Sequence, residues 1–283
     1  MSRLSSIKHV ALDLDGTLYL GGRLFTWTPG FLQALRELGI GRTFFTNNSS
    51  KSTKKYVETL NKLGVDATAE EIYSSTHSTF DYLREELPGV KKVYVLGTPG
   101  LREEFGENGF EVVGEEHDEN PDAVVVGYDT TLEYEHVCRA AWWISKGLPF
   151  VATHPDRVCP TDKPTLMVDC AAMCAMLSVA TGRELTAVLG KPDPRMLAGV
   201  MKRQPGLKVE EIGVVGDRLY TDMAMAYGAG AMGILVLSGE ATLGDVERAE
   251  RRPDLIVEHV GVLGEMLAKG PRAKALGLAE SCI

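Results

Sequence analysis

The stretch HVALDLDGTL, residues 9–18, is the segment around which the rest of the chain is organised. Its apolar residues run up to Asp13, and Gly16 predicts a turn directly after Asp15. A buried strand followed by such a turn places both carboxylates at the carboxyl end of the strand, where open parallel sheets bind ligands. Two neighbouring carboxylates repel each other, so the pattern predicts either a hard metal ion or a proton-sharing pair.

Length and composition favour a globular protein of two domains. The chain has 283 residues, of which 44 % are hydrophobic and 24 % are charged, and its formal net charge is −9. This acidity argues against nucleic acid or an anionic membrane as partner. No apolar run approaches the roughly 20 residues of a membrane span, and the N-terminus does not resemble a signal peptide. The five cysteines lack the spacing of a metal site, so we expect a reduced, cytoplasmic setting.

A second polar segment, Thr46-Asn47-Asn48-Ser49-Ser50, follows a predicted strand at 42–46. A hydroxyl and Asn amides at a turn that enters a helix can form an anion site, because free backbone N–H groups point outward there. The alternative is that Ser49 or Ser50 caps the helix that we expect to begin near Lys51.

The block at 77–186 has a β-α-β-α rhythm of its own and is long enough for a domain. It contains the tandem aromatics Trp142 and Trp143, of which we expect one to face the core and one to be exposed, with a dimer contact as the alternative. Residues 154–168 contain three prolines and predict a loop before a helix at 169–181.

Polar residues return at strand ends after this block. Lys191, in the stretch GKPDP, follows a predicted strand at 187–189 and precedes a helix. Asp217 follows a strand at 211–216, and Asp222 falls on the first turn of the next helix, where acidic residues are also ordinary partners of the helix dipole. We expect last strands at 234–237 and 255–257, and weak order after about residue 270.

Four segments together, DLDGT, TNNSS, GKPDP and GDRLYTD, resemble the four motifs of the haloacid dehalogenase-like hydrolases, in order and over nearly the whole chain. The placement of the middle block resembles subfamily IIA, the group of NagD, AraL and the phosphoglycolate and pyridoxal phosphatases. The resemblance implies an α/β protein with a Rossmann-like, doubly wound parallel sheet. Its core domain would comprise residues 1–76 and 187–283, with an α/β cap of the C2 type inserted at 77–186.

The resemblance also implies catalytic roles. Asp13 would be the nucleophile that forms an aspartyl phosphate, and Asp15 the general acid and base. Lys191 would offset the negative charge of Asp13 and of the phosphate. The groups implied in phosphate binding are Thr46, Asn47, Asn48, Lys191 and the backbone N–H groups near Leu14 and Gly16.

A magnesium ion is the implied cofactor. Asp13 and Asp217 would bind Mg²⁺ through their side chains, Asp15 through its carbonyl oxygen, and Asp222 would support the metal directly or through water. All these ligands are oxygen atoms, which suits a hard cation that keeps some of its waters.

Two cap segments depart from the family pattern. Residues 153–160 read THPDRVCP, where relatives often have an Asn-Pro-Asp version, and residues 168–173 read VDCAAM, where many have a Gly-rich turn. His154, Arg157 and Cys159 are therefore candidate specificity residues, although Pro155 and Asp156 alone would also make a turn.

The predicted function is a Mg²⁺-dependent phosphatase for the phosphate monoester of a small metabolite. Sugar phosphates, nucleoside monophosphates, phosphoglycolate and pyridoxal phosphate are all open as substrates, and a homodimer through the cap is plausible by resemblance. Phosphotransfer, as in the mutases, is disfavoured by the placement of the cap, and dehalogenation by the presence of Asp15. A receiver-like phosphate sensor would be much shorter and would have no cap.

Overall fold

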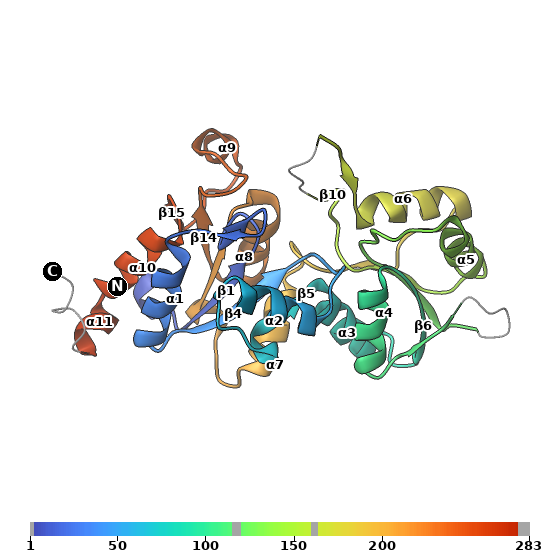
Figure 1. Ribbon diagram of the computed structural model, residues 1–283, viewed down its shortest axis with the longest axis horizontal. Coiled ribbons are helices and arrows are strands. Elements are labelled where there is room, and N and C mark those ends of the chain that lie inside the picture. Colours follow the sequence, from blue (N-terminus) through green and yellow to red (C-terminus); the bar gives the residue numbers. More distant parts are fainter. Residues whose placement is uncertain (1–2, 115–119, 160–163, 277–283) are drawn as a thin grey trace. The chain divides into compact units, whose positions relative to one another are not determined.

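The computed structural model describes residues 3–114, 120–159 and 164–276, and its chain separates into two compact units (Figure 1). Each unit contains its own parallel β-sheet. The first unit consists of Met1–Phe45, Val57–Ile72 and Leu197–Ile283. The second unit consists of Thr46–Tyr56 and Tyr73–Met196.

The larger sheet, most of whose residues belong to the first unit, has six strands in the described part of the chain, in the order β15-β14-β13-β1-β4-β5. Its strands are β1 (His9–Asp13), β4 (Gly41–Thr46), β5 (Ile72–Ser74), β13 (Ile212–Gly216), β14 (Met232–Val236) and β15 (Leu255–Val257). Strand β1 is buried throughout and pairs in parallel with both β13 and β4. Because its neighbours come from opposite ends of the chain, β1 is the central strand of a doubly wound sheet, as predicted.

Along the chain, helices precede and follow the strands of this sheet. They are α1 (Thr28–Glu37), α2 (Thr53–Lys62), α7 (Arg195–Arg203), α8 (Ala224–Ala229), α9 (Leu243–Arg248), α10 (Val260–Ala268) and α11 (Pro271–Ala275). Helix α1 has Pro29 in its first turn and buries Phe31, whose ring contacts α10 where Gly264 has no side chain. A short hairpin of β2 (Tyr19–Leu20) and β3 (Arg23–Leu24) turns through Gly21 and Gly22, both of which have positive φ angles.

The second unit is built on a five-stranded sheet, counted over the described residues, in the order β12-β9-β8-β6-β7. Its strands are β6 (Lys92–Leu96), β7 (Glu111–Val112), β8 (Ala123–Val126), β9 (Phe150–Ala152) and β12 (Ala187–Val188). Its helices are α3 (Ser75–Glu86), α4 (Pro99–Glu107), α5 (Tyr134–Ser145) and α6 (Cys170–Thr181).

Side chains alternate between the two faces of the sheet along β6 and β8, and each face has its own hydrophobic core. Val93 and Val125 pack with the aromatic side chains of α3 and α4, whereas Tyr94 and Val124 pack with α5 and α6. Successive strand residues point to opposite faces, so covering both faces requires the continuous apolar run that the sequence shows here.

Three local predictions need correction. The strand at 187–188 pairs with β9 of the second unit, although we expected it with the core domain. The predicted loop at 154–168 contains two paired strands, β10 (Val158–Cys159) and β11 (Met167–Val168). Residues 271–275 form α11, which a proline opens, although we expected weak order after 270; residues 277–283 lie outside the described chain.

The prediction for the tandem aromatics is confirmed. Trp143 is buried and Trp142 is 51 % exposed, and Cys170 and Cys174 are both part of a hydrophobic core. Cys282 lies outside the described residues, and no disulfide joins the cysteines that are described. Within the described chain, no helix combines the length and the apolar character that crossing a membrane requires.

Candidate active site

The predicted nucleophile lies at the carboxyl end of β1. Asp13 is the last residue of the strand and is only 9 % exposed, and the Thr17 hydroxyl donates a hydrogen bond to its Oδ2 atom at 3.2 Å. The chain then turns through Gly16, whose φ of +84° is in the left-handed region that favours glycine. The Gly16 N–H donates to the carbonyl of Tyr19 at 2.8 Å and so closes this turn.

The two carboxylates of the opening stretch lie in different surroundings. Asp15 is exposed and accepts a hydrogen bond from the Tyr19 hydroxyl at 3.2 Å, whereas Asp13 is buried. A proton-sharing pair requires two carboxylates in one common environment. The difference therefore favours the metal alternative for Asp13, and it leaves Asp15 accessible for proton transfer.

Asp13 is instead grouped with the two aspartates that follow β13. Among the residues described, Asp13, Asp217 and Asp222 each offer a carboxylate oxygen within 4.8 Å of the others. Asp217 and Asp222 are 3 % and 1 % exposed. Asp222 lies in the wide turn Leu219–Met223 that precedes α8. The structure thus brings together acids from the two segments that the sequence singled out.

Glycines make the space for these carboxylates. A Cβ atom on Gly16 or Gly239 would collide with the side chain of Asp217, and one on Gly216 would collide with Asp222. Backbone N–H groups then orient the acids: Glu240 N–H donates to Asp217 at 2.7 Å, and Arg218 N–H to Asp222 at 3.3 Å. Gly239 and Glu240 were not predicted as site residues, because no motif marks them in the sequence.

The cluster fits a hard divalent cation. Three buried like charges at this separation repel one another strongly unless a cation lies among them, and oxygen donors suit Mg²⁺. Arg218 supplies part of the compensation. Burial lowers the pKa of its guanidinium, but the charges of Tyr220, Glu240, Asp217 and Asp13 outweigh burial and raise it.

The second unit brings together Asn47 and Lys191, which are 144 residues apart in sequence. The Lys191 N–H donates to Asn47 Oδ1 at 2.7 Å, and Asn47 Nδ2 donates to the Lys191 carbonyl at 2.9 Å. Asn47 Nδ2 also lies 3.2 and 3.3 Å from the two carboxylate oxygens of Asp156. Both hydrogens of the amide thus have acceptors, so this side chain links the segments of Lys191 and Asp156.

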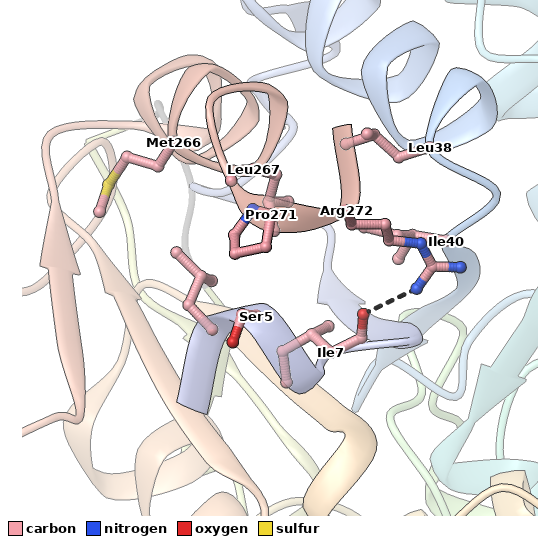
Figure 2. A pocket seen from close by; sticks show the side chains of 10 residues that line it. Ser5, Ile7, Leu38, Ile40, Met266, Leu267, Pro271 and Arg272 are labelled. Atoms are coloured by element: carbon pink, nitrogen blue, oxygen red, sulfur yellow. Dashed lines mark hydrogen bonds between the residues drawn. The ribbon is translucent and has the colours of Figure 1, made fainter. Parts of the chain in front are cut away.

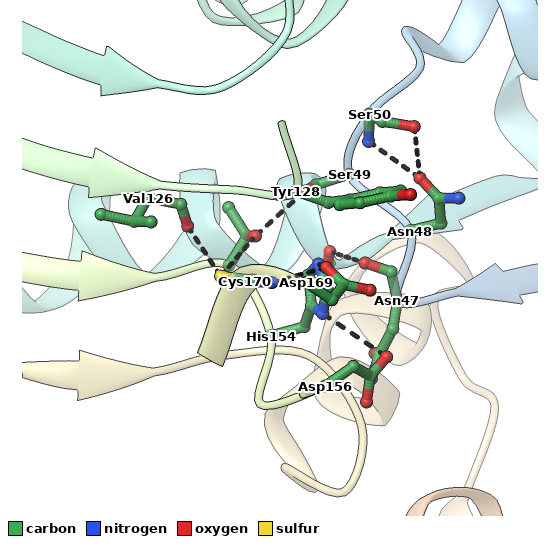
Figure 3. A network of polar contacts seen from close by, with 12 residues as sticks. Asn47, Asn48, Ser49, Ser50, Val126, Tyr128, His154, Asp156, Asp169 and Cys170 are labelled. Carbon is green, nitrogen blue, oxygen red and sulfur yellow. Dashed lines mark hydrogen bonds and ion pairs between the residues drawn. The ribbon is translucent and has the colours of Figure 1, made fainter. Parts of the chain in front are cut away.

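The rest of the loop at 46–50 is organised by its own side chains. Thr46 ends β4, and its hydroxyl accepts the N–H of Asn48 at 3.1 Å. Asn48 Oδ1 accepts the Ser50 N–H at 2.9 Å and the Ser50 hydroxyl at 2.6 Å, a local turn that is visible in Figure 3. The buried Ser49 hydroxyl accepts the N–H of Tyr128.

The expected cap of the following helix is replaced by other groups. Helix α2 begins at Thr53, whose N–H is bound by the carboxylate of Glu104 at 2.9 Å, and Ser52 Oγ accepts from Lys55 at 3.4 Å. Glu104 is distant in sequence and could not be foreseen as the partner.

The cap-loop candidates differ in exposure. Arg157 is exposed and Cys159 is half-buried in β10, whereas His154 is completely buried. His154 lies between two carboxylates, with its Nδ1 3.4 Å from Asp156 and its Nε2 3.6 Å from Asp169 (Figure 3). Asp169 was not predicted; it is the N-cap of α6, where its side chain accepts the Cys170 N–H at 2.6 Å.

Known proteins match this chain over most of its length. A family model described as "Haloacid dehalogenase-like hydrolase" matches residues 10–111, and a second one, described as "HAD-hyrolase-like", matches residues 188–263. An acid sugar phosphatase from Staphylococcus aureus is 32 % identical over 250 residues, which cover 88 % of this chain and 94 % of the relative. The chain belongs to the haloacid dehalogenase-like hydrolases.

Solved structures of this hydrolase family support the subfamily. A 4-nitrophenylphosphatase from Thermotoga maritima has a TM-score of 0.87 and 37 % identity, over 94 % of this chain and 99 % of that one. NagD from Escherichia coli K-12 has a TM-score of 0.80 and 30 % identity, over 90 % and 97 % of the two chains. The resemblance to subfamily IIA that the placement of the middle block indicates is therefore confirmed.

An apolar pocket of the same hydrolase is separate from its acidic cluster. Figure 2 shows the pocket in the first unit, where Arg272 donates to the carbonyl of Ile7 at 3.1 Å. Ile7 and Ile40 precede β1 and β4, so the pocket lies at the amino ends of strands whose carboxyl ends carry Asp13 and Thr46. Its lining lacks the acids that phosphoryl chemistry uses, and parallel sheets bind ligands at the other edge.

Proposed function

We propose that this hydrolase is a Mg²⁺-dependent phosphatase that hydrolyses the phosphate monoester of a small metabolite through an aspartyl phosphate. The observation that carries the proposal is the glycine-lined cluster of Asp13, Asp217 and Asp222 beside an exposed Asp15. The names of its relatives, an acid sugar phosphatase and a nitrophenylphosphatase, support a phosphate ester as substrate. Sugar phosphates are the first class to test.

The two aspartates of the opening stretch divide the chemistry. Asp13 attacks phosphorus and forms the aspartyl phosphate, while Asp15 gives a proton to the departing alcohol oxygen. Asp15 then takes a proton from a water molecule, whose oxygen attacks the aspartyl phosphate and releases inorganic phosphate and free Asp13. The exposure of Asp15 suits an acid that exchanges its proton with solvent, and the Tyr19 hydroxyl orients it.

The remaining groups handle charge. Asp13, Asp217, Asp222 and the carbonyl oxygen of Asp15 would hold Mg²⁺, which when bound neutralises the negative charge that otherwise keeps a carboxylate from approaching a phosphate. By the family pattern, we assign the phosphoryl oxygens to Thr46, to the backbone N–H groups of Leu14 and Asn47, and to Lys191.

Substitution of the nucleophile tests this proposal. Asp13→Asn removes the attacking charge while conserving size, so we expect turnover of p-nitrophenyl phosphate to fall by at least about a thousandfold. Removal of Mg²⁺ with a chelator should abolish turnover, and added Mg²⁺ should restore it. Asp66→Asn is the matched control, because Asp66 is an exposed carboxylate of the first unit. Retained turnover in Asp13→Asn, or in the chelated wild type, contradicts the proposal.

Product analysis separates hydrolysis from phosphotransfer. With an acceptor alcohol added, a phosphatase still releases inorganic phosphate as its main product, whereas a mutase-type enzyme phosphorylates the acceptor. A receiver-like sensor would show no turnover at all. A screen of sugar phosphates, nucleoside monophosphates, phosphoglycolate and pyridoxal phosphate would then rank the substrates by kcat/KM.

We also propose a homodimer through the second unit. Tyr134 and Trp142 on α5 are 82 % and 51 % exposed, and Val179 on α6 is 87 % exposed. Exposed apolar side chains on adjacent helices favour contact with a second copy. Light scattering after gel filtration should report a dimer, and Trp142→Lys should give a monomer. The thiols of the buried cysteines fit the cytoplasm as the working compartment.

A further inference from the structure

A buried histidine between two carboxylates is the most unusual polar feature of the second unit. His154 has no exposed surface, and its two ring nitrogens face Asp156 and Asp169 at 3.4 and 3.6 Å. A neutral imidazole has one N–H and could satisfy one carboxylate, whereas an imidazolium has two and can face both. The arrangement therefore suits the charged form.

The charges around this ring agree with that form. Burial lowers the pKa of His154, but Cys170, Asp156 and Asp169 raise it, to a net value of about 9. Conversely, burial raises the pKa of Asp156, but His154, Asn47 and Lys191 outweigh burial and lower it. A buried carboxylate beside a largely buried one would be costly without a cation, so the imidazolium is the group that makes this pair tolerable.

The contacts continue from this histidine to residues of the predicted active site. Asp156 accepts from Asn47 Nδ2, and Asn47 in turn exchanges two hydrogen bonds with the backbone of Lys191. Gly190 lets the chain pass close to these side chains. A Cβ at this position would come within 3 Å of Asn47 Oδ1 and of the Cβ of His154. All these residues lie in the second unit, and Figure 3 shows the network around His154 and Asn47.

We propose that His154 is a positioning residue: as an imidazolium it holds Asp156, and through Asp156 it fixes Asn47 and the backbone of Lys191. This inference rests on the proposed phosphatase function. His154 is completely buried, so it acts through Asp156 and does not touch the substrate. The departure of THPD from the Asn-Pro-Asp version is then matched by a second departure, Asp169 in VDCAAM, which supplies the second negative charge.

The pH profile of two variants tests the proposal. In the wild type, kcat for p-nitrophenyl phosphate should fall as the pH rises through about 9, because the imidazolium is then lost. His154→Gln should lower kcat roughly tenfold or more at pH 7, with a smaller change in KM, and should lack that alkaline fall. A purely structural role would lower the amount of folded protein but leave the pH profile of the folded fraction unchanged.

Asp169→Asn is a second variant that tests the proposal even if His154→Gln does not fold. An asparagine still caps α6, so folding is preserved while one negative charge is removed. The alkaline fall of kcat should then move to lower pH, with activity at pH 6 close to that of the wild type. Cys170→Ser removes the third group that raises the pKa of the ring, so it too should move the alkaline fall to lower pH.

NMR of the histidine ring nitrogens gives a readout that is independent of turnover. Two protonated nitrogens for His154 at pH 7 support the proposal. A neutral ring at pH 7, an unchanged pH profile in both variants, or a metal ion such as zinc bound at His154 in the purified protein would overturn it. An inactive wild type would instead contradict the phosphatase function, while the NMR result would still report on the imidazolium.

Discussion

The two units bury clusters of carboxylates in different ways. In the first unit, Asp13, Asp217 and Asp222 converge with Arg218 as a partial counter-charge. In the second unit, Asp156 and Asp169 lie on the two sides of His154, which can carry its own positive charge. The first cluster lacks a neutralising cation among its own members, whereas the second contains one. A buried acidic group without an internal cation is suited to bind one, and a group with one is suited to hold structure.

The largest effect should come from the same chemical change made once in each cluster. Asp217→Asn removes a proposed metal ligand, so we expect kcat/KM for p-nitrophenyl phosphate to fall by about a thousandfold at pH 7 and saturating Mg²⁺. Asp169→Asn should stay within about threefold of the wild type, because the amide still caps α6. Initial rates measure both variants. Equal losses would remove the distinction between the two clusters.

A glycine substitution sharpens the account of the first cluster. Gly239→Ala would push a Cβ against the carboxylate of Asp217, and we expect the Mg²⁺ concentration for half-maximal activity to rise about 10- to 100-fold. Gly30→Ala is the matched control, since Gly30 lies in α1 with open space around it. The control should keep the Mg²⁺ dependence and raise the free energy of unfolding by about 0.5 kcal/mol. An unchanged Mg²⁺ dependence in Gly239→Ala would contradict the idea that Gly239 makes space for the Asp217 carboxylate.

Mg²⁺ should stabilise the protein through the first cluster alone. At a free concentration of about 100 times its Kd, a ligand that binds only the folded state adds about 2.7 kcal/mol to the free energy of unfolding. We expect the thermal midpoint of the wild type and of His154→Gln to rise with Mg²⁺, and that of Asp217→Asn to stay constant. Thermal unfolding with and without a chelator measures this. If Mg²⁺ failed to raise the thermal midpoint of His154→Gln, the cation would bind in the second unit, which contradicts this prediction.

The smallest expected effect is a dependence of stability on pH. Since the pKa of folded His154, about 9, lies above 6.5, its ordinary value, its stabilising effect is complete below pH 6.5 and is lost as the pH rises through about 9. The difference in thermal midpoint between the wild type and His154→Gln should therefore be larger at pH 6 than at pH 10. A constant difference over this range would mean that the ring is neutral in the folded protein.

The parts of the fold that depend on local pattern could be predicted from the sequence. An apolar run with a glycine turn identified β1 and placed Asp13 at its end, and the same reasoning located Lys191 and Asp217 at the ends of strands. Helix α10 was not predicted, because its two glycines lower helix propensity. It forms nevertheless, since Gly264 lets it approach Phe31 of α1 closely.

The parts that depend on partners distant in sequence could not be predicted. Strand β12 has two residues, and its place follows from pairing with β9, which no local signal reveals. Asn47 was assigned to phosphate from its position in TNNSS, but its amide is engaged by Lys191 and Asp156. His154 was considered as a substrate contact, and only the position of Asp169, fifteen residues later, shows why it is buried.

The bond between Asn47 and Lys191 also has a consequence for synthesis. Residue 191 leaves the ribosome long after residue 47, because 144 residues separate the two. At translation rates of about 5–20 residues per second, this delay is roughly 7 to 30 seconds. During that interval the nascent chain cannot complete the loop after β4, so a chaperone or protease that meets the emerging polypeptide encounters it with this loop still open.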